Sequence, residues 1–274
     1  MAKVDKSQYT KEEWHKIREQ RRQEKETKAI EESHDLDDVE NYVLCLKHGV
    51  KYSSEYVNRL NRMIKRHCTV PFRFACLTDD ASDLDSDIIP LPLPNFVSGW
   101  WCKPYMFSKD LPIKGNILYL DLDVVISNNI DKLFSYQHGH WCIVRDFTRA
   151  MRPKWPKYNS SVIRFRTGEL DFVWEEFREN YKDITRRFHG DQDYLYDATI
   201  KKRGAMLWPD SWILSWKWEV RKSREFMPGS RRGNRIFRYD EHNAKPRPEC
   251  CICVFHGEPN PHLIKDKWVV ENWK

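Results

Sequence analysis

From residue 41 onward, short apolar runs alternate with stretches whose apolar positions recur at helical spacing. Apolar runs of about 4–8 residues between turn residues are typical of buried strands. We therefore predict buried strands at Tyr42–Lys47, Phe72–Leu77, Ile88–Leu93 and Asn116–Leu120.

The helical stretches lie between these strands. Residues Ser54–His67 place Tyr56, Leu60 and Ile64 on one face, which predicts a helix. A shorter helix is predicted at Lys103–Lys109. This alternation predicts an α/β fold with a mostly parallel sheet, in which ligands bind at the carboxyl ends of the strands.

Residues 1–40 follow a different pattern, with both charge signs and few apolar residues. Glu–Lys and Glu–Arg pairs at helical spacing favour a charged extension that is helical or mobile, with a partner-docking arm as the alternative. We expect the folded domain to span 41–274. Within it, residues 221–248 form a basic insertion, which is either a surface loop or a loop that faces the acceptor or a phosphate.

Composition narrows the class of protein. Of 274 residues, 40% are hydrophobic and 14% aromatic, which is enough for a sizeable core and excludes wholesale disorder. Apolar runs stay far below the roughly 20 residues of a membrane span, and no signal peptide is visible, so we expect a cytoplasmic protein. The net charge of +6 is modest, so nucleic acid is an unlikely partner. The 8 cysteines are expected to be reduced thiols.

The sharpest chemical signal is ILYLDLDVVI, where an apolar strand leads into Asp121 and Asp123. Residues at i and i+2 of an extended chain face the same way, so both carboxylates can turn toward one cation. Hard oxygen ligands suit Mg²⁺ or Mn²⁺ bridging to a diphosphate. Such a pair can also simply end a strand, so other polar segments have to support the metal interpretation.

Three downstream segments give that support. Residues Tyr158–Phe165 begin as a polar Asn-Ser-Ser turn that opens into a strand, and Asp191 and Gln192 follow a glycine at the start of a helix-like run. His256 ends a predicted strand, and its imidazole could add a nitrogen ligand beside the two carboxylates.

In this order, the motifs KP, YLDLDVV, NSSV, GDQD and FHG resemble the nucleotide-sugar glycosyltransferases of the GT-A fold, in particular glycosyltransferase family 8. The resemblance covers about residues 41–268. It implies a Rossmann-type mixed sheet flanked by helices, with a nucleotide-binding half at 41–145 and an acceptor half at 146–274. It also implies an enzyme that transfers a hexose from a nucleoside diphosphate sugar, with uridine as the expected base and retention as the expected outcome. The acceptor is an unknown carbohydrate, lipid-linked or protein hydroxyl.

The resemblance also assigns the metal site and the nucleotide end of the donor. Asp121 and Asp123 match the metal-binding pair, and His256 matches the histidine that completes the Mn²⁺ or Mg²⁺ site. Tyr52 resembles the aromatic residue that stacks on the base. Asn260 stands where the family has a phosphate-binding lysine, so this sequence departs from the pattern there.

The remaining matches concern the sugar. Lys103 matches the basic residue that contacts the donor diphosphate and sugar, and Asn159 matches an asparagine that touches the sugar. Asp191 and Gln192 match the pair that contacts sugar hydroxyls near the anomeric carbon. On the residues alone, Lys103 could instead be a solvated lysine, Asn159 a turn residue, and Asp191 a helix N-cap.

Other functional classes fit parts of the same pattern. A metal-dependent phosphohydrolase or nuclease would use Asp121 and Asp123 on phosphoesters. A non-catalytic module would bind a nucleotide sugar without turnover. Release of UDP from a UDP-sugar distinguishes the transferase from these alternatives.

Overall fold

The computed structural model describes residues 40–222 and 244–274. The predicted charged extension at 1–40, apart from Glu40, and most of the basic insertion at 221–248 lie outside the described residues. Among the helices in the described ranges, none combines the length and the apolar character needed to cross a bilayer. All eight cysteines are free thiols, as expected.

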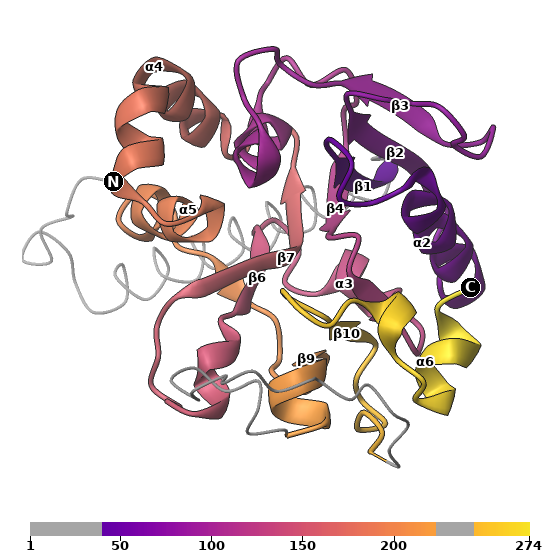
Figure 1. Ribbon diagram of the computed structural model, residues 1–274. Helices are drawn as coiled ribbons and strands as arrows, with labels where there is room; N and C mark the ends of the chain where they lie inside the picture. Colours follow the sequence, from indigo (N-terminus) through magenta and orange to yellow (C-terminus); the bar gives the residue numbers. More distant parts are fainter. Residues whose placement is uncertain (1–39, 223–243) are drawn as a thin grey trace, which may run out of the picture. The chain divides into compact units, whose positions relative to one another are not determined.

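A mixed sheet of seven strands lies at the centre of the described domain (Figure 1), with the strand order β3-β2-β1-β4-β7-β6-β8. Strands β1 to β4 run parallel where they pair, whereas β7 is antiparallel to both β4 and β6. The predicted α/β class with a mixed sheet is therefore confirmed. The strands are β1 (Asn41–Lys47), β2 (Arg73–Thr78), β3 (Ile89–Pro92), β4 (Asn116–Leu120), β6 (Cys142–Arg145), β7 (Tyr158–Arg166) and β8 (Met206–Leu207).

A smaller sheet follows directly from the carboxyl end of β4. It consists of β5 (Val124–Ile126), β9 (Ile213–Ser215) and β10 (Ile252–Val254), in the order β5-β10-β9. Because β10 pairs with β5, the backbone amide of Phe255 donates to the carbonyl of Asp123 at 2.9 Å. The C-terminal segment therefore lies beside the DLD segment, more than a hundred residues away in sequence.

Helices cover both faces of the central sheet (Figure 1). Strand β1 directs Val43 and Cys45 into one apolar core and Tyr42 and Leu44 into the other. A sheet buried on both faces explains why its strands are continuous apolar runs. One core includes α2 (Ser54–His67), α6 (Lys267–Asn272) and the small sheet, and the other includes η2 (Gly99–Phe107), α4 (Asp171–Arg187) and α5 (Asp191–Ile200).

Two predicted elements differ from the structure. The helix predicted at Lys103–Lys109 is instead the second half of the 3₁₀-helix η2, which begins at Gly99, contains Pro104 and ends at Phe107. The predicted turn at Asn159–Ser161 is instead the beginning of β7. The polar residues of β7 are buried there because they bond to other side chains of the site described below. The remaining short helices are α3 (Lys132–Ser135), η3 (Phe147–Ala150), η4 (Trp216–Val220) and η6 (Pro261–Leu263).

Gly115, just before β4, is expected not to tolerate a side chain. A Cβ atom at this position would lie 2.0 Å from the carbonyl oxygen of Glu40, which accepts a bond from Asn116. We expect Gly115→Ala to lower the free energy of unfolding by about 1–3 kcal/mol, measured by urea denaturation. Gly204→Ala is the matched control, because nothing lies within 4 Å of its Cβ position. Equal effects of the two changes would contradict the steric account.

Candidate functional site

A buried lysine joins the carboxylates at the carboxyl end of β4. Lys103 Nζ lies 2.9 Å from Asp121 Oδ1 and 3.4 Å from Asp191 Oδ2, and it donates to Ser160 Oγ at 3.0 Å. Only 9% of the Lys103 side chain is exposed, so the alternative of a solvated lysine is wrong. Burial alone would lower the pKa of Lys103, but Asp121 and Asp191 together raise it above its ordinary value. Lys103 is therefore a permanent positive charge inside the fold.

Each member of this cluster comes from a different element. Asp121 follows β4, and its backbone amide donates to the carbonyl of Ser161 in β7 at 2.9 Å. Strand β7 bulges against β6, because Ile143 pairs with Ile163 but Val144 pairs with Asn159. Bulges re-aim side chains next to functional sites. This bulge turns the Ser160 hydroxyl toward Asp191, to which it donates at 2.6 Å.

Asp191 begins helix α5, so its carboxylate lies at the positive end of the helix. The helix N-cap is Gly190, and no side chain makes a capping bond, so the alternative role of Asp191 as the N-cap is wrong. Gln192, the next residue, accepts a 3.4 Å bond from the Asn159 amide and lies 3.5 Å from Asp146 Oδ2. Asn159 also accepts a local bond from the backbone amide of Ser161 at 3.1 Å.

Asp123 is the most electrostatically unfavourable carboxylate of the site. Burial, followed by the negative charge of Asp121, raises the pKa of Asp123 to about 6, although Lys51 and Lys103 oppose the shift. The Tyr52 hydroxyl donates to Asp123 Oδ2 at 3.2 Å and lies 3.4 Å from Asn260 Oδ1. Burial and the two aspartates raise the pKa of Tyr52, so this hydroxyl keeps its proton.

The charge balance of the cluster suits a divalent cation. Lys103 pairs with Asp121 and Asp191, and the charge of Asp123 also acts on it, so three carboxylates face a single buried ammonium. The surplus of two negative charges matches one Mg²⁺ or Mn²⁺, and carboxylate oxygens are the ligands these ions prefer. Asp121 and Asp123 would hold the ion, because the repulsion between them is what such a cation relieves.

His256 does not join the two aspartates in this structure. Its Nε2 lies 2.8 Å from Ser215 Oγ, and its ring stacks on Phe147 at 5.1 Å and meets the edge of Trp218 at 4.7 Å. In the described part of the chain, no three or more His, Cys, Asp or Glu side chains gather as a metal site. The predicted three-ligand site is therefore not assembled here. The physical reason is that an aromatic niche and the Ser215 hydroxyl already surround the imidazole.

His256 makes a testable contribution to stability instead. Burial, and then the charge of Lys217, lowers the pKa of His256 well below its ordinary value. Because the unfolded chain binds the proton more tightly, stability is full above about pH 6.5 and declines as the pH falls below it. We expect His256→Gln to lose part of this decline, measured as melting temperature between pH 5 and 8. An unchanged pH profile would show that His256 is not buried as a neutral group.

The structure adds residues that the sequence analysis did not select. The Tyr119 hydroxyl donates to Asp121 Oδ1 at 2.7 Å, and period-two alternation along β4 would have placed the two on one face. Lys51 is exposed, its Nζ lies 4.7 Å from the centre of the Tyr52 ring, and its positive charge lowers the pKa of Asp123. Trp100 is 56% exposed, and its Nε1 lies 3.8 Å from the Cβ position of Gly190. No sequence signal separates Lys51 or Trp100 from other surface residues.

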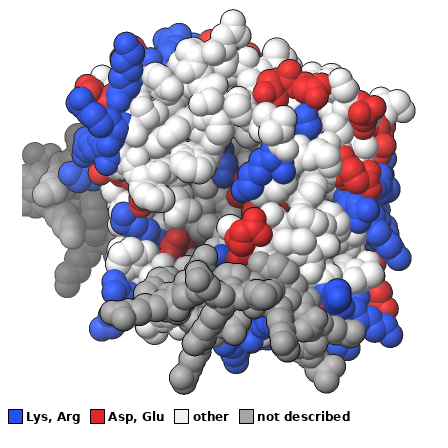
Figure 2. All heavy atoms as spheres, in the orientation of Figure 1, with Lys and Arg blue, Asp and Glu red and all other residues white. Residues whose placement is uncertain are grey.

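The surface is hollowed over the centre of the domain (Figure 2), and acidic and basic side chains lie in and beside the hollow. Predicted residues from β4, β7, η2 and α5 therefore converge at one end of the sheet, where Tyr52 after β1 also reaches Asp123. The strand order reverses between β1 and β4, and such switch points are where open α/β sheets bind ligands.

No protein-family model matches the sequence, and no curated protein matches it by sequence. Solved structures do match. The galactosyltransferase LgtC, solved in complex with donor and acceptor sugar analogs, aligns with a TM-score of 0.52 and 14% identity over 80% of this chain and 88% of LgtC. The glycosyltransferase GlyE of Streptococcus pneumoniae TIGR4 aligns with a TM-score of 0.56 and 11% identity over 85% of this chain and 62% of GlyE. The bifunctional glycosyltransferase WbbM aligns with a TM-score of 0.54 and 12% identity over 85% of this chain and 51% of WbbM.

At these identities the comparison concerns the fold. The central mixed sheet with helices on both faces is the architecture that the resemblance to GT-A enzymes implies. That expectation is confirmed, and the chain has the fold of the glycosyltransferases LgtC, GlyE and WbbM.

Proposed function

We propose that this protein is a glycosyltransferase that moves a hexose from a UDP-sugar to an acceptor hydroxyl, with retention of configuration. The observation that supports it most strongly is the buried ion pair of Lys103 with Asp121 and Asp191 at the carboxyl end of β4. Ligands of open α/β sheets bind at the carboxyl ends of the strands, and charged groups fixed there can stabilise the negative charge of a diphosphate leaving group.

Asp121 and Asp123 are the residues that would hold Mn²⁺ or Mg²⁺, which acts as a Lewis acid on the diphosphate when bound. Lys103 adds a fixed positive charge next to them, and such a charge is most effective where water is excluded. Ser160 and Tyr119 orient Lys103 and Asp121, so the charges are in place before the reaction begins.

The sugar is assigned to Asp191, Gln192 and Asn159, whose side chains lie together at the start of α5. Gln192 is an amide and a poor nucleophile, and Asp191 is already engaged by Lys103 and Ser160. The chain therefore favours transfer on the front face of the sugar, in which the acceptor hydroxyl is positioned against the anomeric carbon without a covalent intermediate.

Asn260 stands where the family that this sequence resembles has a phosphate-binding lysine. We assign the contact with the diphosphate to Lys51 instead. It is exposed, and it lies close enough to the site to lower the pKa of Asp123 against the effect of burial. Exposed charges contribute little, so we expect Lys51→Ala to raise KM for the UDP-sugar about two- to fivefold with kcat almost unchanged. Lys109→Ala, an exposed lysine of the same charge, is the control. Equal KM values in the two variants would remove Lys51 from the donor site.

A panel of UDP-hexoses with Mn²⁺ tests the proposed activity through UDP release, with NMR of the product for its anomeric configuration. We expect turnover with one donor and none when Mn²⁺ is withheld. Release of inorganic phosphate from p-nitrophenyl phosphate would favour a phosphohydrolase. UDP binding without turnover on any donor and acceptor would favour a binding module.

A further inference from the structure

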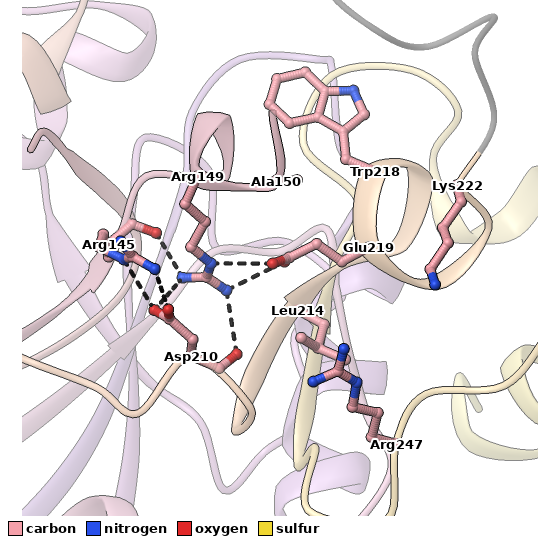
Figure 3. Close-up of a pocket in the computed structure, with 9 residues that line it drawn as sticks. All are labelled: Arg145, Arg149, Ala150, Asp210, Leu214, Trp218, Glu219, Lys222 and Arg247. Atoms are coloured by element: carbon pink, nitrogen blue, oxygen red, sulfur yellow. Dashed lines mark hydrogen bonds and ion pairs between the residues drawn. The ribbon is translucent and has the colours of Figure 1, made fainter. Parts of the chain in front are cut away.

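A second cavity, of about 420 Å³, lies between β6, η4 and the segment before β10 (Figure 3). Cavities of this size accommodate small ligands. Four basic side chains and two acidic side chains line it, which leaves an excess of two positive charges. These six are Arg145, Arg149, Lys222, Arg247, Asp210 and Glu219.

Two of the basic side chains form ion pairs with the two acidic side chains of the cavity wall. Arg149 is buried and donates to Glu219 Oε1 at 3.0 Å and to the carbonyls of Arg145 and Ile213. Arg145 pairs with Asp210, with a 3.1 Å bond from its Nε. The negative charges of Asp210 and Glu219 are therefore balanced by Arg145 and Arg149. The bonds of Arg149 to Glu219 and to two backbone carbonyls hold this part of the wall in place.

The other two basic side chains of the cavity, Lys222 and Arg247, form no ion pair with a carboxylate of the described residues. In the described ranges, neither the Lys222 nor the Arg247 side chain has a hydrogen bond or ion pair, and both line the cavity, Lys222 just after η4 and Arg247 from the segment before β10 (Figure 3). Lys222 has a φ of 54°, a left-handed conformation that is uncommon for a lysine, and it follows the π-helix η4. Strained backbone and π-turns both concentrate at functional sites.

The cavity adjoins the proposed sugar end of the donor site. Asp146, directly after Arg145, lies 3.5 Å from Gln192 Nε2. Phe147 follows, and His256 lies between it and Trp218, whose indole lines the cavity. A molecule in the cavity would therefore lie beside Arg145, whose neighbour in the chain, Asp146, contacts the Gln192 side chain that is assigned to the sugar.

We propose that this cavity binds the acceptor and that the acceptor is a phosphate-bearing sugar. Lys222 and Arg247 would bind the phosphate, because ammonium and guanidinium groups form the strongest hydrogen bonds to phosphate oxygens. Trp218 offers an apolar ring face for the sugar. This assignment rests on the proposed glycosyl transfer, since it names the second substrate of that reaction.

The test is calorimetric titration of the full chain with glucose 6-phosphate, glucose and inorganic phosphate, with UDP and Mn²⁺ titrated in parallel. We expect glucose 6-phosphate to bind at least tenfold more tightly than either fragment. The double variant Lys222→Ala, Arg247→Ala should weaken that binding at least tenfold and leave UDP binding unchanged. The control removes the same charge from exposed lysines outside the cavity, Lys201→Ala with Lys245→Ala, and should leave both unchanged.

Several results would overturn the assignment. If glucose binds as tightly as glucose 6-phosphate, the cavity does not recognise the phosphate. If inorganic phosphate binds as tightly as glucose 6-phosphate, the cavity does not recognise the sugar. Undiminished binding in the double variant would place the ligand elsewhere. If UDP and Mn²⁺ bind but glucose 6-phosphate does not, this inference fails alone. If UDP does not bind while glucose 6-phosphate does, the transferase proposal fails and the cavity loses its role as an acceptor site.

Discussion

Replacing Lys103 with methionine is expected to lower the free energy of unfolding by about 3–5 kcal/mol, because it leaves two carboxylates without their buried counter-ion. The ammonium lies 2.9 Å from Asp121 and 3.4 Å from Asp191, and its side chain is 9% exposed. Methionine keeps the length and apolar stem of lysine, so packing changes little. The loss is therefore electrostatic, and urea denaturation at pH 7.5 measures it.

A second change identifies the cause. Adding Asp191→Asn to Lys103→Met removes one of the orphaned charges and should restore part of the stability. Lys109→Met, at an exposed position of the same segment, should change the free energy of unfolding by less than about 0.5 kcal/mol. If Lys103→Met is as mild as Lys109→Met, the cluster is solvated and does not hold the site together.

Asp123→Asn is expected to act in opposite directions on stability and activity. Metal-dependent UDP release should fall by a factor on the order of 10²–10³, as for removal of one charged group from a transition-state site. Without metal, the same change should raise the melting temperature at pH 7.5, because it removes a buried carboxylate repelled by Asp121. A variant that is more stable and inactive indicates a strained functional site.

The pH dependence gives the sign of this effect. The pKa of Asp123 is about 6 in the folded chain and 3.8 in the unfolded chain, so the folded state binds the proton more tightly. The wild type therefore loses stability as the pH rises from about 4 to 6, and the loss is complete above that range. The advantage of Asp123→Asn, about 1–3 kcal/mol at pH 7.5 in EDTA, should shrink toward zero near pH 4. A constant advantage at all pH values would contradict the raised pKa.

Local patterns predicted the elements with strong periodicity. Helix α2 spans Ser54–His67 and β4 spans Asn116–Leu120, both at the predicted bounds, because their apolar positions repeat without interruption. The convergence of Lys103, Asp121 and Asp191 was expected from the motif order alone. No local property of three segments spread between residues 103 and 191 fixes the distances between them.

The remaining features depend on contacts that a single segment does not encode. Asn159–Ser161 was predicted as a turn because its residues are polar, yet it forms a strand whose polar groups bond to Lys103, Asp191 and Gln192. His256 was matched by its position before a glycine, but Ser215 and two aromatic rings from distant segments surround it. The pocket at Lys222 and Arg247 joins residues that share no motif.

The most direct test of the account is whether the cluster around Asp121 binds a nucleoside diphosphate through a metal. Calorimetric titration of the full chain with UDP, with and without Mn²⁺, measures this without knowledge of the sugar or the acceptor. The account predicts binding only with Mn²⁺ and at least a tenfold loss in Asp121→Asn, with no loss in the control Asp110→Asn at an exposed position. UDP binding that is independent of Mn²⁺ and equal in both variants, or no UDP binding at all, would contradict the assignment of this cluster as the donor site.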